Sequence, residues 1–199
     1  MSDSTPTFDD RTALVVVDVQ NDFAHPDGNL YVDGGDRTIP VINELVERAS
    51  EKGAFVVYTQ DWHPAKTPHF VTGGGTWPVH CVRDTWGAEL HRDLVVAGPV
   101  VRKGTGGEDG YSGFSVRDVE TDQEQPTELG ELLAGRGTER VVVVGLAEDV
   151  CVSATALDAQ RLGYQTVVHG PATRPVEATP GDGERARAEL REAGVTVTS

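Results

Sequence analysis

The stretch Arg140-Val-Val-Val-Val-Gly145-Leu-Ala-Glu-Asp-Val-Cys151-Val decides the fold of this chain. Four consecutive valines ending at Gly145 predict a fully buried strand, of the near-continuous apolar kind found in parallel sheets. Apolar residues then recur at rough helical spacing as far as Gly163, a residue typical of a helix end. We therefore expect a tight strand-to-helix turn at residues 146–149, with Cys151 in the first turn of the helix.

The rest of the chain alternates between apolar runs and segments in which apolar residues have helical spacing. Further strands are expected at residues 12–19, 54–60, 94–102, 165–169 and 195–197, and further helices at residues 37–52, 127–134 and 181–193. This alternation predicts an α/β fold, a three-layer α/β/α Rossmann-like sandwich whose sheet is parallel. Residues 1–11 are expected to form a flexible leader, and residues 12–199 a single domain.

The composition excludes several classes of protein. A formal net charge of −15 argues against nucleic acid and anionic membranes as partners. No apolar run approaches the ~20 residues of a membrane span, and the acidic N-terminus does not resemble a signal peptide. The two cysteines lie in unrelated contexts, which predicts no disulfide framework and a reducing compartment. We therefore expect a cytoplasmic protein.

Four reactive side chains lie at or just after the ends of four different expected strands: Asp18, Asp61, Lys103 and Cys151. The carboxyl ends of parallel strands meet at one edge of the sheet, which is where open α/β sheets bind ligands. The sequence therefore predicts a functional site at this edge.

Cys151, Asp18 and Lys103 form the first candidate constellation. Backbone N–H groups at a helix N-terminus lower the pKa of a cysteine and could hold an oxyanion beside its sulfur. A neighbouring carboxylate could accept the thiol proton, and a lysine ammonium could hold that carboxylate and favour the thiolate. Each residue also has an ordinary explanation: a buried small hydrophobe for Cys151, a helix cap or salt bridge for Asp18, and a solvated surface lysine for Lys103.

A second constellation lies in a long irregular loop rich in Gly, Pro, His and Trp. Asp61-Trp-His63 puts two ligands on the same side of an extended segment, and His80 can close the site from the far end of the loop. One carboxylate and two imidazoles suit a divalent metal ion, Zn²⁺ first, with Mn²⁺ or Fe²⁺ as alternatives. His69 is a looser candidate ligand, and Cys81 is either a fourth ligand or a packed thiol. Loop histidines bonded to the backbone are the alternative explanation.

Two aromatic residues near these constellations, Phe23 and Trp77, could flank a flat ring, although core packing would explain them equally well. The glycine-rich run that starts at Gly104 precedes no evident helix and lacks the spacing of a nucleotide-binding loop. We therefore expect a small-molecule substrate and neither a nucleic-acid nor a membrane partner. The oligomeric state is left open, a homo-oligomer included.

Together these motifs resemble the nicotinamidase branch of the isochorismatase-like hydrolase (cysteine hydrolase) superfamily. Any single motif would be weak, but the set occurs in family order, spans most of the chain and is highly specific. The matching segments are Val-Val-Val-Asp18-Val-Gln-Asn-Asp-Phe23, Thr-Gln-Asp61-Trp-His63-Pro, Trp77-Pro-Val-His80-Cys, Lys103-Gly followed by Tyr-Ser-Gly-Phe114, and Gly145-Leu-Ala-Glu-Asp-Val-Cys151-Val.

The resemblance implies a six-stranded parallel sheet and a metal-dependent hydrolysis of nicotinamide to nicotinate and ammonia through a thioester. It implies a cis peptide bond before Ala147, so that two backbone N–H groups form an oxyanion hole. The implied roles are a catalytic triad of Cys151, Asp18 and Lys103, metal ligation by Asp61, His63 and His80, ring contacts from Phe23 and Trp77, and an oxyanion hole of Ala147 and Cys151.

Three positions depart from the family pattern. Before the nucleophile, where Thr-Asp-Tyr or Thr-Asp-His is frequent, this chain has Glu148-Asp149-Val150, and Gly110 stands where serine is common. None of these changes touches the triad or the ligand set, but Val150 alters the pocket wall, so the preference among nicotinamide analogues is left open. The alternatives are another cysteine amidase of the superfamily acting on a carbamoyl or ureido substrate, and a non-catalytic binding module.

Overall fold

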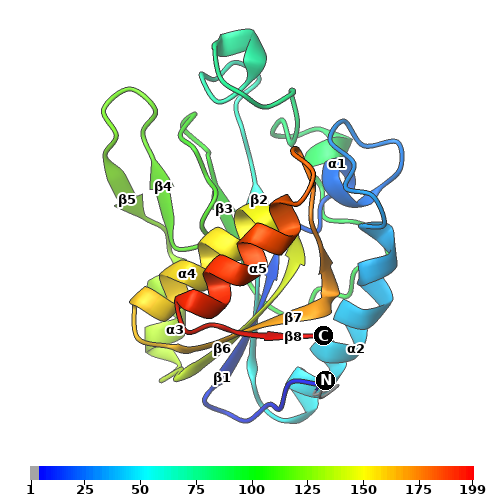
Figure 1. Cartoon of the computed structure of the whole chain (residues 1–199), viewed down its shortest axis with the longest axis vertical. Coiled ribbons are helices and arrows are strands. Elements are labelled where there is room, and N and C mark those ends of the chain that lie inside the picture. The colour runs from blue at the N-terminus through cyan, green and yellow to red at the C-terminus, as the bar shows by residue number, and fades with distance from the viewer. Residues whose placement is uncertain (1–4) are drawn as a thin grey trace.

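The computed structural model describes residues 5–199, and within them the main sheet has six parallel strands in the order β3-β2-β1-β6-β7-β8 (Figure 1). This confirms the predicted parallel sheet. The strands are β1 (Thr12–Val17), β2 (Phe55–Asp61), β3 (Val100–Lys103), β6 (Arg140–Leu146), β7 (Gln165–Arg174) and β8 (Thr196–Thr198).

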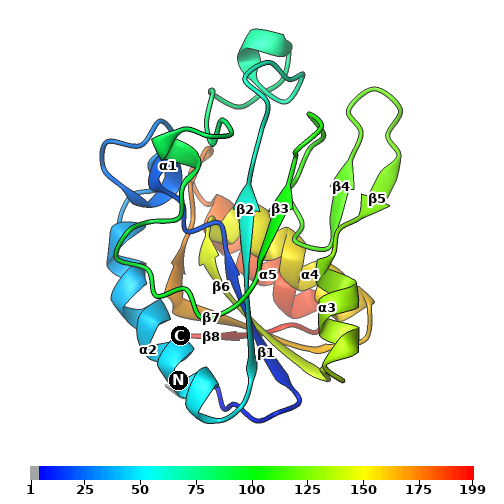
Figure 2. The ribbon, with the colours of Figure 1, turned by 180° about the vertical axis from the view of Figure 1, so that it is seen from behind.

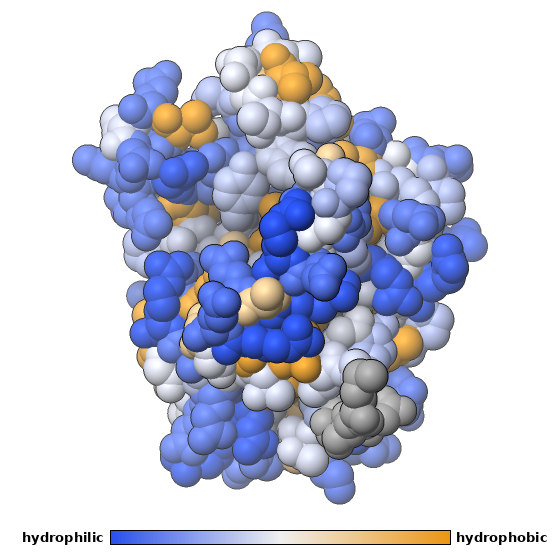
Figure 3. Space-filling view, viewed as in Figure 1, coloured by the Kyte–Doolittle hydropathy of each residue, from blue (hydrophilic) through white to orange (hydrophobic). Residues whose placement is uncertain are grey.

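Helices cover both faces of the sheet, which completes the predicted three layers (Figures 1 and 2). Side chains of β1 alternate between the faces. Leu14 packs in one apolar cluster with α2 (Ile39–Glu51), whereas Val15 packs in the other with α3 (Leu129–Gly135), α4 (Ser153–Arg161) and α5 (Asp182–Glu192). The outer surface over α4 and α5 is largely hydrophilic (Figure 3), as expected for helices with one apolar face.

The centre of the sheet positions the site. The chain leaves β1 toward β2 on one side and leaves β6 toward β7 on the other, so the strand order reverses between β1 and β6. A crevice forms beyond the carboxyl ends of strands at such a point. Gly145 pairs with Val17 there at a φ of 111°, and a Cβ on it would collide with the Val17 carbonyl oxygen, so only glycine fits.

Some elements differ from the sequence expectation. The strand expected at 94–102 is only β3, because Gly98 packs too close to the Val56 carbonyl for any side chain and Pro99 has no N–H to donate. A short helix, α1 (Asn21–Ala24), follows β1 and is not among the helices expected from the sequence.

An antiparallel hairpin also lies outside the main sheet and was not predicted. Its strands are β4 (Ser115–Arg117) and β5 (Glu124–Pro126). It projects beside β3 (Figure 1), and all three residues of β5 are exposed. Exposed polar strands carry no alternation of apolar residues, so no sequence pattern marks this hairpin.

The flexible leader expected at residues 1–11 stays a prediction. Residues 1–4 lie outside the described residues. Within the rest, Phe8 packs against the core and the Asp9 carboxylate accepts a hydrogen bond from the Thr12 hydroxyl. Among residues 5–199 no helix is long and apolar enough to cross a membrane.

Candidate active site

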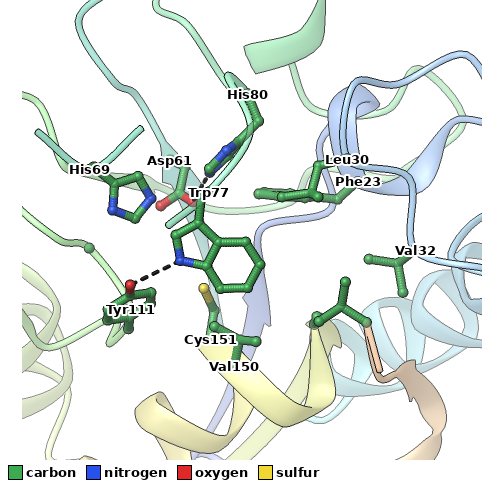
Figure 4. Close-up of a pocket in the computed structure, with 13 residues that line it drawn as sticks. Phe23, Leu30, Val32, Asp61, His69, Trp77, His80, Tyr111, Val150 and Cys151 are labelled. Atoms are coloured by element: carbon green, nitrogen blue, oxygen red, sulfur yellow. Dashed lines mark hydrogen bonds and ion pairs between the residues drawn. The ribbon is translucent and has the colours of Figure 1, made fainter. Parts of the chain in front are cut away.

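A cavity opens at the carboxyl edge of the sheet, beyond β1 and β6 (Figure 4). Its lining combines polar and apolar side chains. We call the part lined by Asp61, His69, His80 and Cys151 the polar end; Leu30 and Val32 lie across the cavity from His69, and Val150 lies beside Cys151 (Figure 4). Phe23, Trp77 and Tyr111 add aromatic walls.

Lys103 lies at the centre of the polar end, at the last residue of β3. It is completely buried, and its Nζ lies 2.7 Å from Asp18 Oδ2 and 2.5 Å from Asp61 Oδ1. The same ammonium donates to the Gly110 carbonyl and lies 3.7 Å from Cys151 Sγ. Burial alone would lower its pKa, but Asp18 and then Asp61 raise it well above the ordinary value, so this lysine is charged.

Asp18 directly follows β1 and is fully buried. Its backbone adopts a φ of 48°, a left-handed conformation that aspartate tolerates better than most residues and that is common at functional sites. The Thr59 hydroxyl donates to its Oδ1 at 2.6 Å. Burial raises the pKa of Asp18 to about 6, because Lys103 lowers it only in part and the Asp61 charge raises it further. A carboxylate tuned in this way is suited to accept a proton near neutral pH.

Cys151 lies in a π-helix (Glu148–Val152) that leads from β6 into α4, and its sulfur faces the cavity (Figure 4). Burial raises the pKa of its thiol well above the ordinary value; Lys103 opposes this and Asp18 adds to it. The lowered pKa expected from the helix N-terminus is therefore not found. The resting thiol keeps its proton, and Asp18 is placed to take it.

We call residues 146–153 the nucleophile turn. Its Leu146–Ala147 peptide bond is cis, as the resemblance implies. The Ala147 carbonyl accepts the N–H groups of Val150 and Val152, each at 3.1 Å. The Asp149 carboxylate accepts backbone N–H groups of residues 176 and 177, at 2.8 and 2.9 Å. The turn is thus held by hydrogen bonds on both of its sides.

We call residues 61–89 the metal loop. Side-chain nitrogens of His63, His69 and His80 lie within 4.8 Å of one another, and all three residues are buried. Asp61 Oδ2 lies 3.7 Å from His63 Nε2 and 3.9 Å from His80 Nε2. Among the described residues, both ring nitrogens of His63 lack a hydrogen-bond partner, which fits a nitrogen reserved for a metal ion.

The other two imidazoles are oriented by second partners, as metal-bound histidines usually are. His80 Nδ1 lies 2.7 Å from the Pro78 carbonyl, and His69 Nδ1 lies 2.6 Å from Asp109 Oδ1. Burial lowers the pKa of His80 to about 4 and also lowers that of His69, so both rings are neutral and able to ligate near pH 7. The donors fit one divalent ion such as Zn²⁺.

Two contacts that the sequence did not predict hold this cluster in place. Gln20 donates to the Asp61 carbonyl and accepts the Asp61 N–H, both at 2.8 Å. Gly104 has a φ of 70°, and a Cβ on it would collide with the His63 ring. Gln20, a polar residue directly after the strand expected at residues 12–19, was the available signal for the first contact.

Cys81 is the second buried cysteine and does not belong to the metal cluster found among residues 5–199. Its Sγ lies 4.0 Å from the Gly87 carbonyl, and its N–H donates to Asp22 Oδ2 at 2.6 Å. Burial raises the pKa of its thiol well above the ordinary value. This geometry is that of a packed thiol.

The structure thus brings together every residue that the sequence placed in the site. Asp18, Lys103 and Cys151 meet at the polar end, and Phe23 and Trp77 line the cavity. Tyr111 was not assigned a role, although its hydroxyl accepts a 3.0 Å hydrogen bond from Trp77 Nε1.

Comparisons with known proteins point in one direction. A family model described as the isochorismatase domain matches residues 12–199. Nicotinamidase of Escherichia coli (strain K12) is 36% identical over 203 residues, covering 93% of each chain. PnC1 from L. infantum, solved in complex with nicotinate, aligns with a TM-score of 0.88 at 36% identity over 98% of this chain and 96% of that one. Pyrazinamidase of Pyrococcus horikoshii, solved in complex with zinc, aligns with a TM-score of 0.83 at 39% identity over 95% and 99%.

Proposed function

This chain belongs to the isochorismatase family, and from that premise we propose that it is a metal-dependent cysteine amidohydrolase that converts nicotinamide to nicotinate and ammonia. One observation carries the proposal. The Cys151 sulfur and the carboxylates of Asp18 and Asp61 lie within 4.8 Å of one another, and Cys151 and Asp61 line one cavity together with His69 and His80. In the proposed binding mode the carboxamide of nicotinamide lies at Cys151 and its ring nitrogen faces the metal site.

In the proposed mechanism Asp18 accepts the Cys151 thiol proton as the sulfur attacks the carboxamide carbon. Lys103 keeps its charge throughout and stabilises the ionised Asp18 before attack. The backbone N–H groups of Ala147 and Cys151 hold the oxyanion. Asp18 then returns the proton to the leaving nitrogen, ammonia departs, and water deprotonated by the same carboxylate hydrolyses the thioester.

Asp61, His63 and His80 would hold the divalent ion, with His69 as a further candidate ligand. When bound, the ion supplies an anchoring and polarising contact for the pyridine nitrogen. Phe23 and Trp77 would then confine the ring within the cavity. Zn²⁺ is the ion we propose first, since imidazole and carboxylate ligands suit it, with Mn²⁺ and Fe²⁺ as alternatives.

The histidine cluster argues against the carbamoyl or ureido alternative, because such a substrate carries no ring nitrogen for a metal ion to hold. The intact triad argues against a non-catalytic binding module. The cytoplasmic location and any homo-oligomer stay predictions from the sequence.

Ammonia release from nicotinamide by the purified protein tests the function. We expect release that stops on chelation and returns with one of Zn²⁺, Mn²⁺ or Fe²⁺. Release from a carbamoyl substrate but not from nicotinamide, whatever the metal, would contradict the substrate and keep the reaction class.

A further inference from the structure

Glu148 is a buried carboxylate that the mechanism above does not use. It is the second residue after β6, directly beside Ala147, and is only 2% exposed. Its Oε2 accepts a 2.8 Å hydrogen bond from the Thr173 hydroxyl of β7. Its Oε1 lies 2.5 Å from Arg187 Nε of α5. One side chain therefore joins the nucleophile turn to a strand and to a helix.

The backbone of Glu148 is fixed from the other side. Its carbonyl oxygen accepts both the N–H and the hydroxyl of Ser153, the hydroxyl at 2.5 Å. The turn is thereby closed on itself, but these bonds do not locate it relative to the rest of the sheet. Continuity with β6 places the start of the turn, and the carboxylates of Glu148 and Asp149 orient the rest of it, because both bind the same segment, residues 173–177.

A carboxylate in such a position is costly to bury, and its burial is tolerated because it is fully paired. Arg187 is only partly buried, with 38% of its side chain exposed, and the hydrogen bond to Glu148 raises its pKa. These contacts fix the orientation of the turn. The two carboxylate oxygens of Glu148 accept from two separate donors, so rotation of the turn would break at least one hydrogen bond.

We infer that Glu148 is a positioning residue for the oxyanion hole, acting through Thr173 and Arg187 on the N–H groups of Ala147 and Cys151. The inference rests on the proposed function, since the oxyanion belongs to that reaction. An oxyanion exists in the transition state and not in bound substrate, so misplacement of the hole slows turnover without weakening substrate binding.

The test compares Glu148→Gln with the wild type. Glutamine keeps the volume but offers one acceptor oxygen to two donors, so one of the two hydrogen bonds is lost. We expect kcat for nicotinamide to fall about tenfold with KM within about twofold, since small displacements of catalytic groups have effects of this size or larger. Asp182→Asn is the matched control, because Asp182 pairs with Arg185 on the same helix without touching the turn. It should leave both constants unchanged.

A second readout separates positioning from general loosening. A thiol adds to an aldehyde, so we expect nicotinaldehyde to form a bond from its carbonyl carbon to Cys151 Sγ: the C=O π bond opens, the thiol proton passes to Asp18 or to the new oxygen, and that oxygen occupies the hole. Nicotinate, which has no aldehyde, is expected to bind the same cavity without this bond. We expect inhibition by nicotinaldehyde to weaken about tenfold in Glu148→Gln and that by nicotinate to stay unchanged.

Equal weakening of both inhibitors, or unchanged kcat in a folded Glu148→Gln protein, overturns the inference. If that variant does not fold, Thr173→Val takes its place. It removes one of the same hydrogen bonds at nearly constant shape, and the same kinetic and inhibition results are expected of it. A wild type that does not hydrolyse nicotinamide contradicts the proposed function instead, and the two failures are therefore distinct.

Discussion

The nucleophile turn and the metal loop share one edge of the sheet but are built differently. The turn continues β6 directly, and carboxylates of its own residues bind it to β7, α5 and the segment beyond β7. The metal loop is much longer and is held by stacked rings, such as His63 on His69 at 4.6 Å, and by isolated bridges such as His63 to Val82. Strand register therefore sets the nucleophile, whereas contacts between distant loop residues set the metal site.

Each region contains one cysteine, and the two show what makes a cysteine available for chemistry. Burial raises the pKa of both Cys151 and Cys81 well above the ordinary value. Of the two, only Cys151 lines the cavity, and the Lys103 ammonium lies 3.7 Å from its sulfur. Access and a partner for the proton, rather than the resting pKa, distinguish the two thiols.

The largest expected effect comes from exchanging the two cysteines in turn for alanine. Cys151→Ala should lower kcat by about 10⁴-fold or more, because the covalent step disappears, while metal content stays unchanged. Cys81→Ala should keep kcat within about twofold. Steady-state kinetics and elemental analysis measure both, and substantial turnover by Cys151→Ala would contradict the assignment of the nucleophile.

The metal loop is tested by His63→Ala. Loss of one imidazole should remove most of the bound ion and lower activity by about 100-fold, in the range found when metal sites are disturbed. His91→Ala removes a buried histidine outside the loop and should keep the ion. Full metal content in purified His63→Ala, read by elemental analysis, would refute the ligand assignment.

Lys103 joins the two regions, since it pairs with Asp18 on one side and Asp61 on the other. Lys103→Met should leave two buried carboxylates without a counter-charge and lower the free energy of unfolding by about 3–5 kcal/mol. Lys52→Met, at an exposed position, should change it by less than about 0.5 kcal/mol. Denaturant unfolding of the metal-free proteins measures both changes. If Lys103→Met were as stable as Lys52→Met, Lys103 would not couple the nucleophile turn to the metal loop.

The smallest expected effect is a pH dependence of stability and of kcat/KM that comes from Asp18, beside the nucleophile. The folded pKa of Asp18 is about 6 against an ordinary 3.8. Taken alone, this group makes the folded state less stable as pH rises from 3.8 to 6. In that range the folded chain still holds a proton that the unfolded chain has already released. Catalysis follows the opposite trend: kcat/KM should fall about tenfold per pH unit below 6, since a protonated Asp18 cannot accept the thiol proton. A flat profile from pH 5 to 7, at constant metal content, would exclude Asp18 as the base.

The sequence predicted the nucleophile side better than the metal side, for a physical reason. Asp18 and Cys151 follow buried strands, and a run of valines locates the end of a strand to within a residue or two. His69 joins the metal cluster through contacts across the loop that no local pattern encodes. The raised pKa of Cys151 was also beyond reach of the sequence, because it depends on burial beside two carboxylates.

The central place of β1 affects how the chain reaches this structure. β1 can pair with β2 once residue 61 has been synthesised, but its other neighbour, β6, begins only at residue 140. Closing that pairing joins segments separated by most of the domain, which makes folding slow. Until then β1, which is apolar from residue 13 to residue 17, keeps one edge open to other chains. Chains released by a ribosome before residue 140 are therefore expected to aggregate rather than to persist as partly folded monomers.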